Sequence, residues 1–234
     1  MQIQKGDNKD LIKNFCFTPL VSLTTFAIEF AFAFYTLIKY RKTLFGKLAI
    51  TTLIFLGIFQ LAEYNICKVG YVASWTAIGY MAITFLPVLG VHMISLMTKK
   101  TFWVPIGYVI AAITDLAMIF TIKLFSTPSC PGNFVIFNSP VSIFNVAYRI
   151  YYYGFIAIGL LMLCKAIIEN QKNKKIAVWM ILGYASFLIP TMVVYIYEKT
   201  TRVAVPSIMC GFALLFATIL VAKILPEFDK LKNN

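Results

Sequence analysis

The chain has 234 residues, of which 60% are hydrophobic and only 13% are charged. Soluble globular domains average about 45–50% apolar and about 25% charged residues, so this composition excludes that class. The net charge of +12 does not indicate nucleic-acid binding, because the basic residues are divided among short segments between apolar runs.

Seven apolar runs follow one another along the chain. A membrane-spanning helix needs about 20 predominantly apolar residues. Little of the chain lies outside the runs, so residues 1–234 are predicted to form a single integral membrane domain. The predicted fold class is all-α, a seven-transmembrane-helix bundle. We predict spans over 17–38, 48–67, 72–98, 102–125, 141–165, 176–197 and 203–225.

The distribution of lysine and arginine predicts how the bundle is oriented. Short loops rich in these residues stay on the cytoplasmic side. One side of the predicted bundle holds most of the 21 basic residues: Lys39, Arg41, Lys42, Lys47, Lys99, Lys100, Lys165, Lys172, Lys174, Lys175, Lys223, Lys230 and Lys232. We therefore expect a multi-pass protein of the cell membrane with its N-terminus outside and its C-terminus inside. Anionic membrane lipid next to this face accounts for the net charge.

The five cysteines include no C-x-x-C pair, which argues against thiol exchange or a zinc ribbon. In the predicted topology Cys16, Cys67 and Cys130 lie at the outer face, where Cys67 and Cys130 are candidates for a disulfide. The alternative is that these cysteines are small buried apolar residues. The segment 126–140 contains three prolines and a glycine, which rule out a helix. Its apolar residues suggest that it folds back over the outer mouth.

Polar residues recur at helical spacing inside four of the spans. A charged side chain at the bilayer centre costs about 2.5–3.5 kcal/mol on insertion scales, so such residues should face the bundle interior. The four stripes are Thr18, Ser22, Thr25 and Glu29; Gln60, Glu63 and Cys67; Asn145, Arg149 and Tyr152; and Tyr184, Thr191, Tyr195 and Glu198.

We expect these residues to converge on an outward-facing polar pocket below the segment 126–140. The candidate ligand-binding residues are Glu29, Gln60, Glu63, Asp115, Asn145, Arg149, Tyr152 and Tyr195. A structural alternative is that Glu63 or Asp115 forms a buried ion pair with Arg149, which would fix the register of the helices.

Arg149 is the natural contact for an anion, because a guanidinium is always charged and binds carboxylate or phosphate with two hydrogen bonds. Its neighbours Tyr148, Tyr151, Tyr152 and Tyr153 offer aromatic walls, or alternatively belong to an aromatic belt at the membrane surface.

Several chemistries find no support in the sequence. His92 is the only histidine, so a metal site with several imidazoles is excluded, and with Ser95 it is expected to be structural. There is no G-x-S-x-G motif for serine hydrolysis. A retinal Schiff base needs a lysine deep in the seventh span, whereas Lys223 lies at its inner end. We therefore expect no metal, no cofactor and no catalytic residues.

Two resemblances accompany these residues. The segments NFCFTPLVS and FGKLAITTLIFLGIFQLAEYNIC resemble an uncharacterised family of prokaryotic multi-span proteins that begin with a Cys-aromatic-Ser/Thr motif and carry Gln-x-x-Glu in the second span. The matching positions are Cys16, Phe17, Thr18, Gln60 and Glu63. The segment WTAIGYMAITFLPVLGVHMISLM is similar to the seven-helix sensor region that precedes some histidine kinases. Only LPEFDKLKNN follows the last span, so that similarity implies a separate signalling partner.

Three functions stay open at this point. The first is receptor-like binding of a small anionic or lipid-like ligand in the outer pocket. The second is a small-solute or proton-coupled transporter in which Glu29 and Glu63 carry protons. The third is a membrane enzyme that acts on lipid, with Glu63 or Asp115 as acid or base.

Overall fold

The computed structural model describes residues 19–69, 73–121, 142–169, 173–197 and 205–233, and it confirms the all-helical fold. Seven helices among these residues are long and apolar enough to cross a membrane. They are α2 (Pro19–Tyr40), α3 (Leu44–Val69), α4 (Ala73–Thr98), α5 (Trp103–Thr121), α6 (Ser142–Glu169), α7 (Lys174–Tyr197), and a last helix made of α8 (Val205–Ile219), a π-helical turn (Leu220–Ile224) and α9 (Leu225–Asn233).

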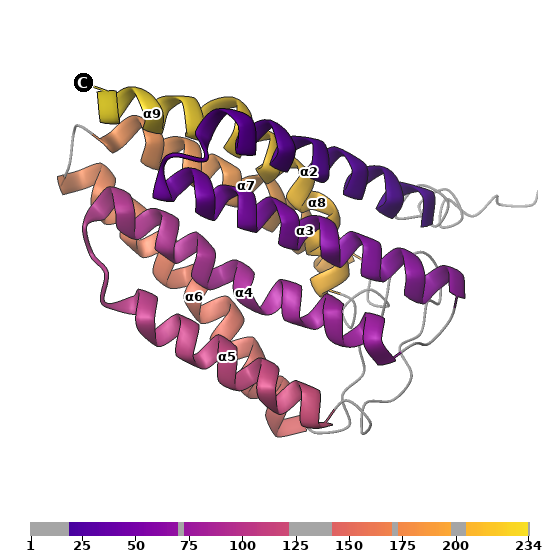
Figure 1. The fold of residues 1–234 in the computed structure, drawn as a ribbon. Coiled ribbons are helices and arrows are strands. Elements are labelled where there is room, and N and C mark those ends of the chain that lie inside the picture. The colour runs from indigo at the N-terminus through magenta and orange to yellow at the C-terminus, as the bar shows by residue number, and fades with distance from the viewer. Residues whose placement is uncertain (1–18, 70–72, 122–141, 170–172, 198–204, 234) are drawn as a thin grey trace, which may run out of the picture.

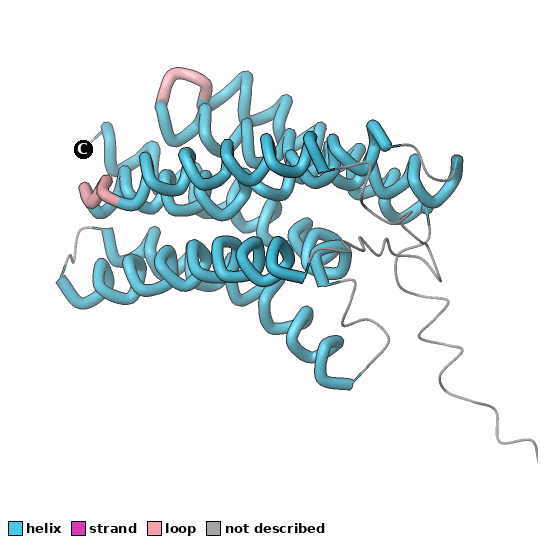
Figure 2. Tube along the Cα trace, turned by 90° about the horizontal axis from the view of Figure 1, so that it is seen from below, coloured by secondary structure: helices cyan, strands magenta, loops and turns pink. Residues whose placement is uncertain are grey.

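The helices lie lengthwise beside one another, with their connections at the two ends of the bundle (Figures 1 and 2). Helix α3 packs between α2 and α4, and α4 also contacts α5 and α6. Helix α8 packs on α7 and reaches back to both α2 and α3, which closes the bundle. The connections 41–43 and 99–102 are short, so the helices that they join are antiparallel neighbours.

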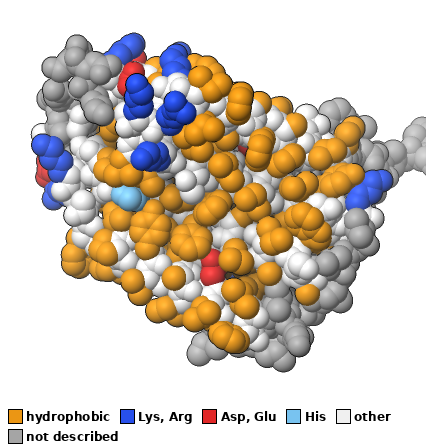
Figure 3. Space-filling view, viewed as in Figure 1, with side chains coloured by type: hydrophobic (Ala, Val, Ile, Leu, Met, Phe, Trp, Pro, Cys, Tyr) orange, Lys and Arg blue, Asp and Glu red, His pale blue; other side chains and the backbone are white. Residues whose placement is uncertain are grey.

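The outer faces of α2 and α5 carry large exposed apolar side chains. Phe34 and Ile38 of α2 are exposed, as are Ile113 and Phe120 of α5. Apolar patches of this kind mark surfaces that contact lipid or other apolar partners. Figure 3 shows hydrophobic side chains over the middle of one face, and most of the visible lysines and arginines at the end where α9 lies. The distribution is that of a multi-pass membrane protein.

Several helix boundaries differ from the prediction, and the differences at α3 and at the last helix have a visible cause. Helix α3 begins at Leu44 rather than at residue 48, because Thr43 acts as its N-cap. The Thr43 hydroxyl oxygen accepts a hydrogen bond from the Gly46 N–H, 2.9 Å away. The last helix extends to Asn233 rather than to residue 225.

The π-helical turn explains how the last helix passes Pro226. The N–H of Leu225 bonds to the carbonyl of Leu220, five residues earlier. Proline has no N–H and its ring crowds the preceding turn of an α-helix, and a wider π-turn relieves this crowding. Helix α9 then returns apolar groups to the core, where Phe228 stacks on Phe45 with ring centroids 4.2 Å apart.

Polar contacts at this end join the helices across the surface. Lys100 pairs with Glu169 at 3.3 Å, and Lys175 pairs with Glu227 at 3.0 Å. The Asn173 amide donates a 2.6 Å hydrogen bond to the Met97 carbonyl. Exposed ion pairs contribute little stability. These contacts therefore chiefly show that this end of the bundle is polar.

Candidate functional site

Polar residues of three helices meet inside one half of the bundle, in what we name the α2–α3–α8 polar cluster. It consists of Glu29 of α2, Gln60 and Glu63 of α3, and Ser207 of α8. Their side chains are between 0 and 4% exposed. The Ser207 hydroxyl donates a hydrogen bond to Oε1 of Glu63. Three residues that the sequence pattern selected are therefore brought together.

The hydrogen bonds of this cluster are incomplete. Both carboxylate oxygens of Glu29 and the Nε2 atom of Gln60 are buried without a hydrogen-bond partner in the described part of the chain. Buried polar atoms in proteins nearly always have a partner, so each exception needs an explanation.

Asp115 belongs to a separate cluster formed by α4, α5 and α6. Its carboxylate lies beside Thr84 of α4, whose own hydroxyl donates to the Tyr80 carbonyl at 2.8 Å. The Tyr151 hydroxyl of α6 donates to the Thr84 carbonyl at 2.7 Å. Helix α5 packs on α4 and α6 rather than on α2, α3 or α8. Asp115 is therefore buried, but it is not part of the α2–α3–α8 polar cluster.

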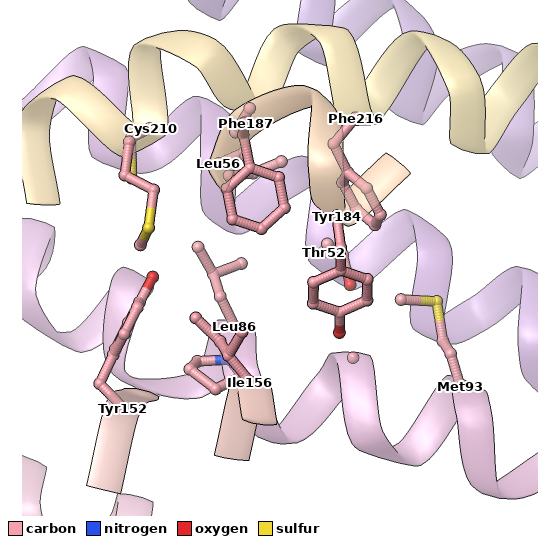
Figure 4. Close-up of a pocket in the computed structure, with 14 residues that line it drawn as sticks. Thr52, Leu56, Leu86, Met93, Tyr152, Ile156, Tyr184, Phe187, Cys210 and Phe216 are labelled. Atoms are coloured by element: carbon pink, nitrogen blue, oxygen red, sulfur yellow. The ribbon is translucent and has the colours of Figure 1, made fainter. Parts of the chain in front are cut away.

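A cavity of about 50 Å³ lies among α3, α4, α6, α7 and α8 (Figure 4). Most of its wall is apolar, and polar atoms come only from Thr52, Tyr152, Tyr184 and Cys210. The apolar lining residues are Leu56, Leu86, Pro87, Gly90, Met93, Ile156, Phe187, Met209, Ala213 and Phe216. Tyr152 is the predicted pocket residue that lines this cavity.

The cavity adjoins the α2–α3–α8 polar cluster through Cys210. This residue lies three positions after Ser207 on α8, and its thiol is within electrostatic range of Glu29 and Glu63. Tyr152 interacts electrostatically with Cys210 from the other side, and in Figure 4 its hydroxyl points toward the helix that carries Cys210.

The remaining predicted site residues do not meet in this interior. Arg149 and Tyr195 are exposed. No ion pair joins Arg149 to Glu63 or Asp115 among the ion pairs of the described residues. Asn145 lies on α6, but its side chain is outside the described part, as are Cys16, Cys130, Glu198 and the segment 126–140. Cys67 is disulfide-bonded.

Helix geometry explains why α6 separates Arg149 from Tyr152. Residues advance by about 100° around an α-helix, so positions three apart differ by about 60°. Tyr152 faces the core, whereas Arg149 turns toward the surface. Residues that follow one another at helical spacing can therefore lie partly in the interior and partly on the surface.

Ser207 and Cys210 are buried on one face of α8, and the sequence pattern did not predict them as site residues. Their three-residue spacing in the seventh span was the available signal. The Nδ1 atom of His92, which the sequence predicts to be a structural residue, lies 3.0 Å from the Tyr108 hydroxyl oxygen. Within the described residues, no three His, Cys, Asp or Glu side chains group closely enough to hold a metal ion.

No protein-family model and no curated protein matches the chain. Function is therefore inferred from the cavity and from the two buried polar clusters.

Proposed function

We propose that this multi-pass protein is a receptor-like protein of the cell membrane that binds a small, lipid-like ligand in the cavity among α3, α4, α6, α7 and α8. The observation that carries the proposal is a cavity with a mainly apolar wall and a few polar groups, enclosed by five helices. Small-molecule sites in proteins usually have this composition.

The cavity has room for a group of several heavy atoms. A single water molecule needs roughly 10–15 Å³ by the measure that counts space for the centre of a water-sized sphere, and this cavity offers about 50 Å³. Its apolar wall gives water few hydrogen-bond partners, so a short alkyl chain or a small ring fits it better. The ligand would gain about 25 cal/mol for each Å² of apolar surface that it removes from water.

Two phenol side chains supply polar contacts for such a ligand. Tyr152 and Tyr184 are both buried and both line the cavity. The Tyr184 hydroxyl lies against Gly90, where the lack of a side chain leaves space for it. A hydroxyl or carbonyl group on an otherwise apolar ligand would find a hydrogen-bond partner here.

The placement of Arg149 favours a lipid-like ligand over an anionic one. Arg149 is the residue that would bind an anionic ligand, but it is exposed and does not line the cavity. The positive charge that an anion would require is therefore missing from the wall. A neutral ligand that enters from the membrane matches the mainly apolar wall of the cavity.

The proposed orientation has the N-terminal end of α2 outside the cell and α9 inside. The connections 41–43 and 99–102 lie at the end where α9 ends, and this end carries Arg41, Lys42, Lys99 and Lys100. Basic segments of this length stay cytoplasmic.

Thermal unfolding of the protein in lipid nanodiscs, with and without short n-alkanols or benzyl alcohol, tests ligand binding. We expect these probes to raise the Tm of the wild type. The Tm of Ala213→Leu should be the same with and without the probes, because Ala213 lines the cavity and the larger side chain fills it. Leu215→Ala is the matched control, since Leu215 lies on the same helix and is half exposed on its outer side.

A wild-type Tm that no probe raises would contradict the proposal. So would equal responses in the wild type and in Ala213→Leu, because the probes would then act on the outer surface rather than in the cavity.

A further inference from the structure

The packing of α2 against α3 brings Glu29 close to Gly57. A Cβ atom placed on Gly57 would lie 3.8 Å from the Cβ atom of Glu29. Glycine therefore leaves room on α3 at the level where Glu29 enters the interface. Glu63 lies almost two turns further along α3, and the carboxyl groups of Glu29 and Glu63 interact electrostatically.

Side-chain direction places Gln60 in the same space. The side chain of a helical residue covers the turn that precedes it. Gln60 therefore covers the position of Gly57, one turn earlier on α3. The side chain of Glu29 points toward the start of α2. Because α2 and α3 are antiparallel, this is the direction in which α3 runs from Gly57 to Gln60 and Glu63. The unpartnered amide of Gln60, which is 1% exposed, thus extends toward the level of Gly57, where Glu29 enters the interface.

Within the described residues, no ion pair offsets the negative charge that this cluster can carry. The ion pairs of the described residues all lie at the basic end of the bundle, and none involves Glu29 or Glu63. Glu63 is held by Ser207 in the first turn of α8, where a helix N-terminus favours an anion. Glu29 has no such partner. An isolated buried charge is strongly unfavourable unless it is paired.

We propose that the α2–α3–α8 polar cluster binds a sodium ion. Its ligands would be the carboxylate oxygens of Glu29 and Glu63, the side-chain oxygen of Gln60 and the hydroxyl of Ser207. The nitrogen and oxygen of an amide are assigned from the hydrogen-bond network, so a turn of the Gln60 amide presents its oxygen to the ion. Hard cations prefer oxygen ligands of this kind.

The four side-chain groups of the cluster favour sodium over calcium and magnesium. Calcium takes six to eight oxygen ligands, with several carboxylates among them, and magnesium usually retains several of its waters. The cluster supplies two carboxylates and two neutral oxygen groups in a dry interior. This site is separate from the apolar cavity in its residues and in its ligand, so it can exist whether or not the cavity binds a lipid-like molecule.

Thermal unfolding in sodium chloride, potassium chloride and choline chloride at equal ionic strength tests the sodium site. Equal ionic strength keeps the screening of surface charges constant. We expect saturating sodium to raise the Tm of the wild type by about 3–5 °C relative to choline. Glu29→Gln and Glu63→Gln should each weaken the sodium response at least about tenfold in sodium concentration, because each removes a charged ligand.

Asp115→Asn is the matched control. It neutralises a carboxylate that is equally buried but lies in the other cluster, so its response to sodium should equal that of the wild type. Equilibrium binding of radiolabelled sodium to the wild type gives a result even when a variant fails to fold, and one ion per chain is expected.

The inference is overturned by a Tm that is the same in sodium and in choline, by a stability that follows pH but not sodium, or by the absence of bound radiolabelled sodium. A sodium response that Asp115→Asn abolishes and Glu29→Gln retains would also overturn it. None of these results bears on the alkanol response that tests the cavity.

Discussion

Two glycines in neighbouring parts of the bundle show how single residues shape the cavity. A Cβ atom on Gly90 would overlap the Tyr184 hydroxyl, whereas a Cβ atom on Gly154 would meet nothing within 4 Å. Gly90 lines the cavity, and Gly154 lies on α6 beside the tyrosines. The same methyl group would therefore have opposite effects at the two positions.

We predict that Gly90→Ala lowers the free energy of unfolding by about 1–3 kcal/mol, because Tyr184 must leave its position in a well-packed core. Gly154→Ala should leave stability unchanged or raise it by about 0.5–1 kcal/mol, since alanine is the better helix former. Thermal and denaturant unfolding in detergent micelles measures both changes. Equal effects of the two substitutions would show that Tyr184 is not packed against Gly90.

The candidate site could be predicted at some residues and not at others. Glu29, Gln60 and Glu63 were found because intramembrane carboxylates must turn inward and because neighbouring helices are joined by a short connection. Ser207 was missed because its contact joins residues 144 positions apart in the chain. Spacing within one helix does not show which distant helix packs on it.

At the scale of the helices, the sequence predicted every span but misplaced some ends. Hydropathy measures which residues cross the membrane, and it does not register a polar cap such as Thr43. It also does not show that a helix continues beyond the apolar region, as α9 does after the π-helical turn. The start of α3 depends on a side-chain cap, and the continuation of the last helix follows a π-helical turn, and composition reveals neither.

The position of α4 in the bundle could not be predicted from the spans alone. It contacts α3, α5 and α6, and thus separates the Asp115 cluster from the α2–α3–α8 polar cluster. The expected single pocket becomes two buried polar clusters and a mainly apolar cavity. The division follows from the packing order, which the hydrophobic pattern of each span leaves open.

At the scale of the whole molecule, the two ends of the bundle differ in charge. We predict that Lys68→Cys reacts with a membrane-impermeant maleimide in intact cells, because Lys68 is exposed at the end opposite to α9. Thr101→Cys, exposed in the connection 99–102, should react only after the cells are lysed. Labelling is measured above that of the wild type, and the reverse pattern would show that the N-terminal end of α2 faces the cytoplasm.

Photolabelling with an alkyl alcohol that carries a diazirine tests most directly whether the cavity holds a lipid-like molecule. In lipid nanodiscs, mass spectrometry should find label on Met209, Ala213 or Phe216 of α8, which line the cavity. Excess unlabelled alkanol should remove this label, and Ala213→Leu should prevent it. Label found only on outward-facing residues such as Ile113 and Phe120 of α5, and unchanged by the competitor, would contradict the proposed function.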